Sequence, residues 1–212
     1  MNTPRVIIPE QKYGGYIFDL DGTLVDSMAM HFKAWRWALA QNGAPYEAFL
    51  WDEFVAHGGM AATDIVTDLN GIYGLNMEPE RVAAQKRAHY DYLVETEHLP
   101  VIPETVGLVR RLREEAIPYA IGTGSAIRGA LATLTSAGIC DLFTVIVTPD
   151  DVAHGKPAPD IFLECARRLG VEPSACVVFE DAEPGLRAAA AAGMDSVRVG
   201  AEARVDASTL VL

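Results

Sequence analysis

Short apolar runs alternate with longer amphipathic stretches along most of this chain. The runs are rich in β-branched and aromatic residues, which is typical of strands buried on both faces of a sheet. In the stretches between them, apolar residues recur at helical spacing, as at Ile127, Leu131 and Leu134, with a proline at the start or a glycine at the end. Strands are predicted at 16–19, 119–122, 144–148, 176–179 and 196–199, and helices at 103–117, 126–139, 159–170 and 184–193.

This alternation predicts an α/β fold with a Rossmann-like parallel sheet and right-handed crossovers. One interval interrupts it, because residues 28–99 contain three helical stretches and no convincing strand. The simplest account is an inserted all-helical cap domain, 28–99. The α/β core would then consist of 1–27 and 100–212, with the cap facing the edge of the sheet where the first strand ends.

Composition and charge narrow the class of protein. The chain has 212 residues, of which 50% are hydrophobic and 22% charged, as expected of a globular protein. Its net charge of −12 repels nucleic acid and anionic membranes, so we expect neither as a partner. The three cysteines show no CxxC spacing. The first residues, "MNTPRVIIPEQKYGG", lack the sustained apolar stretch of a signal peptide, and no run reaches the about 18 apolar residues of a membrane span. We therefore expect a cytoplasmic protein with reduced thiols.

Residues with polar side chains or an accessible amide follow four of the predicted strands, at the strand end or in the loop after it. In an open parallel sheet, ligands bind at the carboxyl ends of the strands. We therefore expect these residues to meet at one edge. They are Asp19 and Asp21 after the first strand, Thr123, Gly124 and Ser125 after the second, Lys156 after the third, and Glu180 and Asp181 after the fourth.

This set of residue types suits phosphoryl transfer. Clustered carboxylates bind Mg²⁺, which prefers oxygen ligands, and a carboxylate can also act as a nucleophile. Hydroxyl and amide groups at a strand-to-helix turn can hold an anion. A lysine offsets the charge of the transferring oxygens, and a second acid can protonate the leaving group and then activate water.

Four ordered segments carry a resemblance to a known family. "FDLDGTLVD", "GTGS", "HGKPAPDIF" and "VVFEDAEPGLRAAAAAGM" resemble the motifs of the haloacid dehalogenase-type phosphatases. The inserted helices resemble the cap of the subgroup that contains β-phosphoglucomutase and sugar-phosphate phosphatases. "HFKAW", "FEDAEPG" and "AAGM" are most similar to the fructose-1-phosphate phosphatase-like members.

The resemblance implies a role for each matching residue. Asp19 corresponds to the nucleophile, and Asp21 to the general acid and base whose backbone carbonyl also faces the metal. Thr123 and the amide of Gly124, with Ser125 beside them, match the phosphate-binding motif, and Lys156 matches the lysine of the third motif. Asp19, Asp21, Glu180 and Asp181 would hold Mg²⁺.

The resemblance also implies that the cap closes over a small phosphorylated sugar. By that analogy His31, Lys86, His57 and Gly58 face the substrate, in a protein expected to be a monomer. The cap loop "AHGGMAATDI" lacks the arginine with which similar mutases hold a second phosphate. The sequence thus favours a Mg²⁺-dependent phosphatase that forms an aspartyl phosphate. A β-phosphoglucomutase and a non-catalytic protein that binds a phosphorylated ligand are the alternatives.

Overall fold

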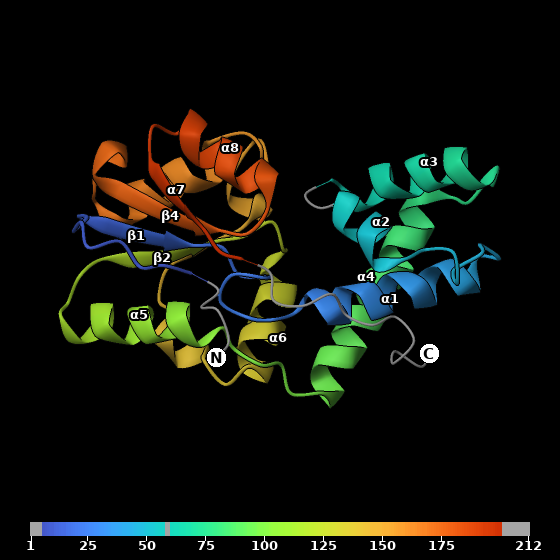
Figure 1. Ribbon diagram of the computed structural model, residues 1–212, viewed down its shortest axis with the longest axis horizontal. Helices are drawn as coiled ribbons and strands as arrows, with labels where there is room; N and C mark the ends of the chain where they lie inside the picture. Colours follow the sequence, from blue (N-terminus) through green and yellow to red (C-terminus); the bar gives the residue numbers. More distant parts are fainter. Residues whose placement is uncertain (1–5, 58–59, 201–212) are drawn as a thin grey trace. The chain divides into compact units, whose positions relative to one another are not determined.

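The computed structural model describes residues 6–57 and 60–200 of the chain. They divide into two compact units, shown as ribbons in Figure 1. The first unit runs to Ser27 and resumes at Leu99, and the second consists of Met28–His98. We call them the core unit and the helical unit.

The core unit contains a five-stranded parallel sheet in the order β3-β2-β1-β4-β5, which confirms the predicted fold class. The sequence of β1, GYIF, contains no charged residue, which suits a strand covered on both faces. All four of its residues are buried at the centre of the sheet. The strands are β1 (Gly15–Phe18), β2 (Tyr119–Gly122), β3 (Ile146–Val147), β4 (Cys176–Glu180) and β5 (Asp195–Arg198).

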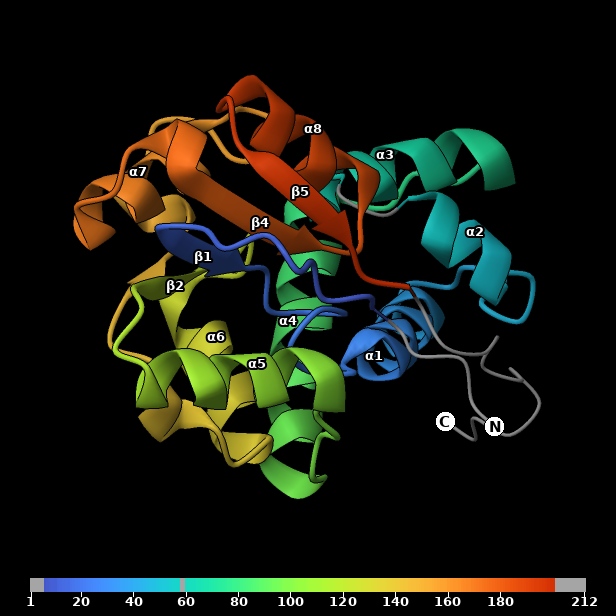
Figure 2. The same ribbon diagram turned by 60° about the vertical axis from the view of Figure 1, so that its left-hand side comes forward.

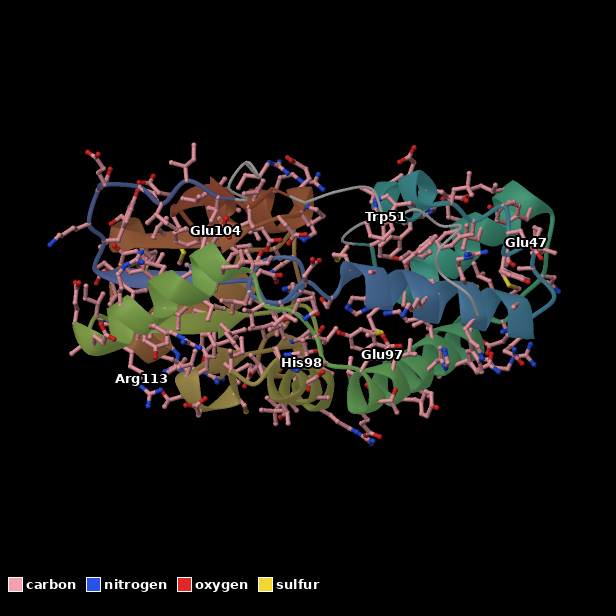
Figure 3. All side chains as sticks on the ribbon, turned by 60° about the horizontal axis from the view of Figure 1, so that its bottom comes forward. Glu47, Trp51, Glu97, His98, Glu104 and Arg113 are labelled. Atoms are coloured by element: carbon pink, nitrogen blue, oxygen red, sulfur yellow. The ribbon has the colours of Figure 1, made fainter. Side chains whose placement is uncertain are left out.

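Helices cover both faces of this sheet. Figures 1 and 2 show α5 and α6 on one face and α7 and α8 on the other. The helices are α5 (Pro103–Glu114), α6 (Ile127–Ser136), α7 (Asp160–Leu169) and α8 (Glu183–Ala191), with short 3-10 turns at Cys140–Leu142, Pro149–Asp151 and Pro173–Ala175. In α5, Glu104 lies in the first turn and Arg113 in the last, a charge order that suits the helix dipole (Figure 3).

Two details of the core unit differ from the sequence prediction. The strand predicted at 144–148 is reduced to β3, a two-residue strand at the edge of the sheet. In α6, Ile127 and Leu131 are exposed and only Leu134 of the predicted stripe is buried. The buried face of α6 is formed instead by Ala130, Thr133 and Leu134, because small side chains let the helix lie close to its neighbours.

The helical unit has its own apolar core. Phe32, Trp35 and Leu39 of the first helix are buried against residues of the next three. A six-residue helix, α2, was not predicted, because one and a half turns carry too little periodicity to be recognised. The helices are α1 (Met28–Gln41), α2 (Trp51–Ala56), α3 (Ala62–Tyr73) and α4 (Pro79–Thr96). No helix in the described ranges is long and apolar enough to cross a membrane.

Candidate active site

The central pair of strands brings two acids together. Phe18 of β1 lies in register with Phe179 of β4, and the amide of Asp19 donates a hydrogen bond of 2.9 Å to the carbonyl of Phe179. Asp19 and Glu180 therefore follow the paired strands as neighbours at their carboxyl ends. Both side chains are almost completely buried, so their charges need partners within the protein.

Lys156 supplies the positive charge between these two acids. Its Nζ donates hydrogen bonds of 2.5 Å to Asp19 Oδ1 and 2.7 Å to Glu180 Oε2. The ammonium also lies 4.9 Å from the centre of the Phe162 ring. Burial alone would lower the pKa of Lys156, but the charges of Asp19 and Glu180 outweigh it and raise the pKa above its usual value.

Asp181 completes a cluster of three carboxylates. Asp19, Glu180 and Asp181 each offer one oxygen, and these atoms lie within 4.8 Å of one another. Burial, and then the charge of Glu180, raises the pKa of Asp19 well above its usual range and that of Asp181 to about 7. When all three acids are ionised, one lysine leaves this cluster with an excess of negative charge. Hard carboxylate oxygens under mutual repulsion fit a divalent cation such as Mg²⁺.

Two glycines make room for the cluster. Gly22 has a φ of +85°, and a Cβ at this position would collide with the carboxylate of Asp181. A Cβ on Gly185, in the first turn of α8, would collide with the side chain of Glu180. Thr23 Oγ1 donates a 3.2 Å hydrogen bond to Asp181 Oδ1. The sequence reasoning missed Thr23 and Gly185, because neither carries a charge that would single it out.

The side chain of Asp21 has separate partners. Its Oδ1 accepts a 2.6 Å hydrogen bond from Ser27 Oγ, and its Oδ2 accepts a 2.8 Å hydrogen bond from Ser125 Oγ. The amide of Ser125 in turn donates to Thr123 Oγ1 at 3.0 Å, and Gly124 between them is exposed. The predicted phosphate-binding residues therefore lie beside the predicted acid and base. The sequence predicts Ser27 only as the last residue before the helical insertion.

The residues predicted in the cap fall into two groups. His31 stacks on Tyr90 at 4.0 Å between ring centres, and its Nδ1 lies 2.8 Å from Lys86 Nζ. His57 is buried elsewhere in the helical unit, with its ring nitrogens 2.7 Å from the Glu53 carbonyl and 2.8 Å from Asp68 Oδ2. Gly58 lies outside the described residues.

Comparison with known proteins identifies the family. The haloacid dehalogenase-like hydrolase model matches residues 13–193. Fructose-1-phosphate phosphatase YqaB of Escherichia coli (strain K12) is 39% identical over 89% of this chain and 97% of its own length. The β-phosphoglucomutase of Bacillus subtilis (strain 168) is 33% identical over 87% of this chain and 82% of its own.

Solved structures agree with the sequence relatives. A HAD hydrolase of family IA, variant 3, from Entamoeba histolytica superposes with a TM-score of 0.74 and 25% identity, over 86% of this chain and 82% of the other. The chain belongs to the haloacid dehalogenase-like hydrolases, as its four motifs had indicated, and it is a hydrolase.

Proposed function

We propose that this protein is a Mg²⁺-dependent phosphatase that hydrolyses a small sugar or polyol phosphate through an aspartyl phosphate on Asp19. The observation that carries the proposal is the position of Asp19 at the end of β1. There its carboxylate accepts a hydrogen bond from Lys156 and lies in a cluster with Glu180 and Asp181. The similarity to a fructose-1-phosphate phosphatase supports the substrate class.

Each of the predicted site residues of the core unit has its own role in the reaction. Asp19 attacks phosphorus, and the bond to the leaving alcohol breaks as Asp21 gives that oxygen a proton. Asp21 then takes a proton from the water that hydrolyses the acyl phosphate. Lys156 opposes the rise in the pKa of Asp19 and holds its carboxyl group in place, while Thr123 and the amide of Gly124 hold the phosphoryl oxygens. Mg²⁺, held by Asp19, Glu180, Asp181 and the backbone carbonyl of Asp21, would supply charge stabilisation for the phosphoryl group.

For the helical unit we propose a role in choosing the sugar. Lys86 and His31 form a polar group flanked by aromatic rings, since Lys86 Nζ lies 5.8 Å from the Trp35 ring centre and 5.2 Å from that of Tyr90. Such a group suits a sugar, because a sugar has polar hydroxyls as well as apolar C–H faces. We also propose that the protein is cytoplasmic, in keeping with its cysteine spacing, and that it is a monomer, by analogy with the family that it resembles.

Phosphate release from defined substrates tests this proposal. Fructose-1-phosphate, glucitol-6-phosphate, glucose-6-phosphate and ribose-5-phosphate would each be incubated with the protein, with Mg²⁺ or with EDTA. We expect release only with Mg²⁺, and its loss in Asp19→Asn. Asp141→Asn is the matched control, because Asp141 is an exposed acid paired only at the surface with Arg113. Release by Asp19→Asn at the wild-type rate would overturn the assignment of the nucleophile.

The similarity to a β-phosphoglucomutase gives the second candidate. Incubation with β-glucose-1-phosphate and a trace of the bisphosphate separates the two activities. A phosphatase releases inorganic phosphate from this mixture, whereas a mutase yields glucose-6-phosphate. We expect phosphate, because residues 56–65 contain no arginine for a second phosphoryl group.

A further inference from the structure

We propose that Ser27 and Ser125 are positioning residues that aim the carboxyl group of Asp21 at the leaving oxygen. This inference rests on the proposed phosphatase function. It also gives Ser125 a task other than the phosphate binding predicted from its motif. The starting observation is that the two hydroxyls bond to different oxygens of Asp21, Ser27 to Oδ1 at 2.6 Å and Ser125 to Oδ2 at 2.8 Å.

Two contacts on opposite oxygens fix the plane of the carboxyl group. A single hydrogen bond would leave rotation about the last side-chain torsion, which is broad for aspartate. Proton transfer needs the oxygen within hydrogen-bond reach of the leaving group, so this rotation matters for the rate. The serine pair therefore restricts the motion that would most directly misplace the acid.

Ser27 is itself held firmly. Its side chain is fully buried, and its amide donates a 2.9 Å hydrogen bond to the carbonyl of Val25. The amide of Asp26 donates a 2.8 Å hydrogen bond to the carbonyl of Pro100. This bond links the residues before the helical unit to those that follow it. Ser125 is held by the hydrogen bond that its backbone amide donates to Thr123 Oγ1.

Hydroxyl partners suit a group that must gain and lose a proton. A hydroxyl donates to an ionised carboxylate and can turn to accept from a protonated one. A lysine or a backbone amide can only donate, and would favour the ionised form alone. The two serines can thus hold Asp21 in both stages of the reaction, first as the acid for the alcohol and then as the base for water.

Leaving-group dependence tests the inference. The substrates are the most rapidly hydrolysed of the four sugar phosphates and p-nitrophenyl phosphate, whose phenolate leaves without a proton. In Ser27→Ala and Ser125→Ala we expect kcat/KM, which reports the steps up to departure of the leaving group, to fall about 10-fold on the sugar phosphate and less than about 3-fold on p-nitrophenyl phosphate. Ser125→Thr keeps the hydroxyl and should restore the rate, while Ser174→Ala, at an exposed serine, is the matched control.

The outcomes separate this inference from the proposed function. Equal losses of kcat/KM on both substrates would overturn the positioning role while leaving the phosphatase intact. Asp21→Asn must show the same selective loss on the sugar phosphate, and more strongly, because it removes the proton itself. No release from any sugar phosphate by the unsubstituted protein would overturn the proposed function and this inference together. Circular dichroism of each variant confirms that it folds.

Discussion

At the level of single residues, the site depends on one lysine shared by two buried acids. Lys156 donates to both Asp19 and Glu180, and all three side chains are nearly buried. Removing one partner of a buried charged group leaves the others uncompensated, which is far more costly than losing a surface ion pair.

Lys156→Met should therefore destabilise the metal-free protein by about 3–5 kcal/mol, besides abolishing activity. Urea unfolding in EDTA would measure the change. Lys12→Met is the matched control, since Lys12 is exposed, and should change stability by less than about 0.5 kcal/mol. An equal effect of the two substitutions would contradict the buried-charge account.

Asp181 gives a prediction for pH. Burial and the charge of Glu180 raise the pKa of Asp181 to about 7 in the absence of metal, above its value in an unfolded chain. The protonated form is thus favoured by folding, so this contribution to stability is complete below about pH 4 and is lost as pH rises through about 7. In EDTA, the free energy of unfolding should include a fall of up to about 1.4 kcal/mol per pH unit between pH 5 and 7.

Saturating Mg²⁺ should reduce or reverse this pH dependence, because a bound cation favours the ionised acids. Urea titrations at several pH values, with EDTA or with Mg²⁺, would show it. Identical slopes under the two conditions would contradict the assignment of Asp181 as a metal ligand.

Residue types, but not their pairings, could be predicted from the sequence. Asp19, Glu180 and Asp181 stand in recognisable motifs at the ends of predicted strands, and Lys156 stands in a motif in the loop after the third; the structure brings the four together. No sequence pattern indicates that Ser27 and Ser125 bond to one carboxylate. That contact depends on how two loops approach each other in space.

At the level of elements, the first turn of α8 is set by the space that Glu180 occupies. Gly185→Ala should destabilise the protein by about 1–3 kcal/mol and weaken Mg²⁺ binding, because the new methyl group would displace the Glu180 side chain. Gly107→Ala, inside α5, is the matched control. The nearest atom to its new Cβ would be Arg111 Nη1 at 4.0 Å, so it should stabilise the protein by about 0.5–1 kcal/mol. Thermal unfolding with and without Mg²⁺ would compare them, and two changes of the same sign would contradict this account.

Long periodic elements could be predicted, and short ones could not. Strand β2 begins and ends where its apolar run does, at Tyr119 and Gly122. Strand β3 keeps only Ile146 and Val147, since it pairs on one side alone, with β2, and little of its apolar run finds a partner. The predicted stripe of α6 is wrong at Ile127 and Leu131, because the helix buries the small residues Ala130 and Thr133 beside Leu134 and leaves these two large side chains exposed.

At the level of the whole molecule, the negative net charge of the protein repels the negatively charged substrate that we propose. A net charge of −12 repels a sugar phosphate at long range, and salt screens this repulsion. With Mg²⁺ kept saturating, kcat/KM should rise about two-fold as NaCl increases from 10 to 150 mM. The rate on one sugar phosphate over this salt range would measure the effect. A fall in kcat/KM would mean that a local positive field controls substrate entry.

The division into units was predicted from one gap in the strand pattern. Helical residues between Ser27 and Leu99 form a separate compact unit in the structure, with its own aromatic core around Phe32. That this unit acts as a cap over the substrate stays a prediction. Relative rates of Lys86 and His31 variants on the four sugar phosphates would test this prediction.

The central claim is that Asp19 carries the phosphoryl group during the reaction. The enzyme would be mixed with Mg²⁺ and the best sugar phosphate, quenched in acid within milliseconds, treated with borohydride and digested. Borohydride reduces an acyl phosphate to an alcohol, so the account predicts homoserine at position 19 in the peptide around β1. Homoserine at position 21 instead, or unmodified aspartate at both positions during steady turnover, would contradict it.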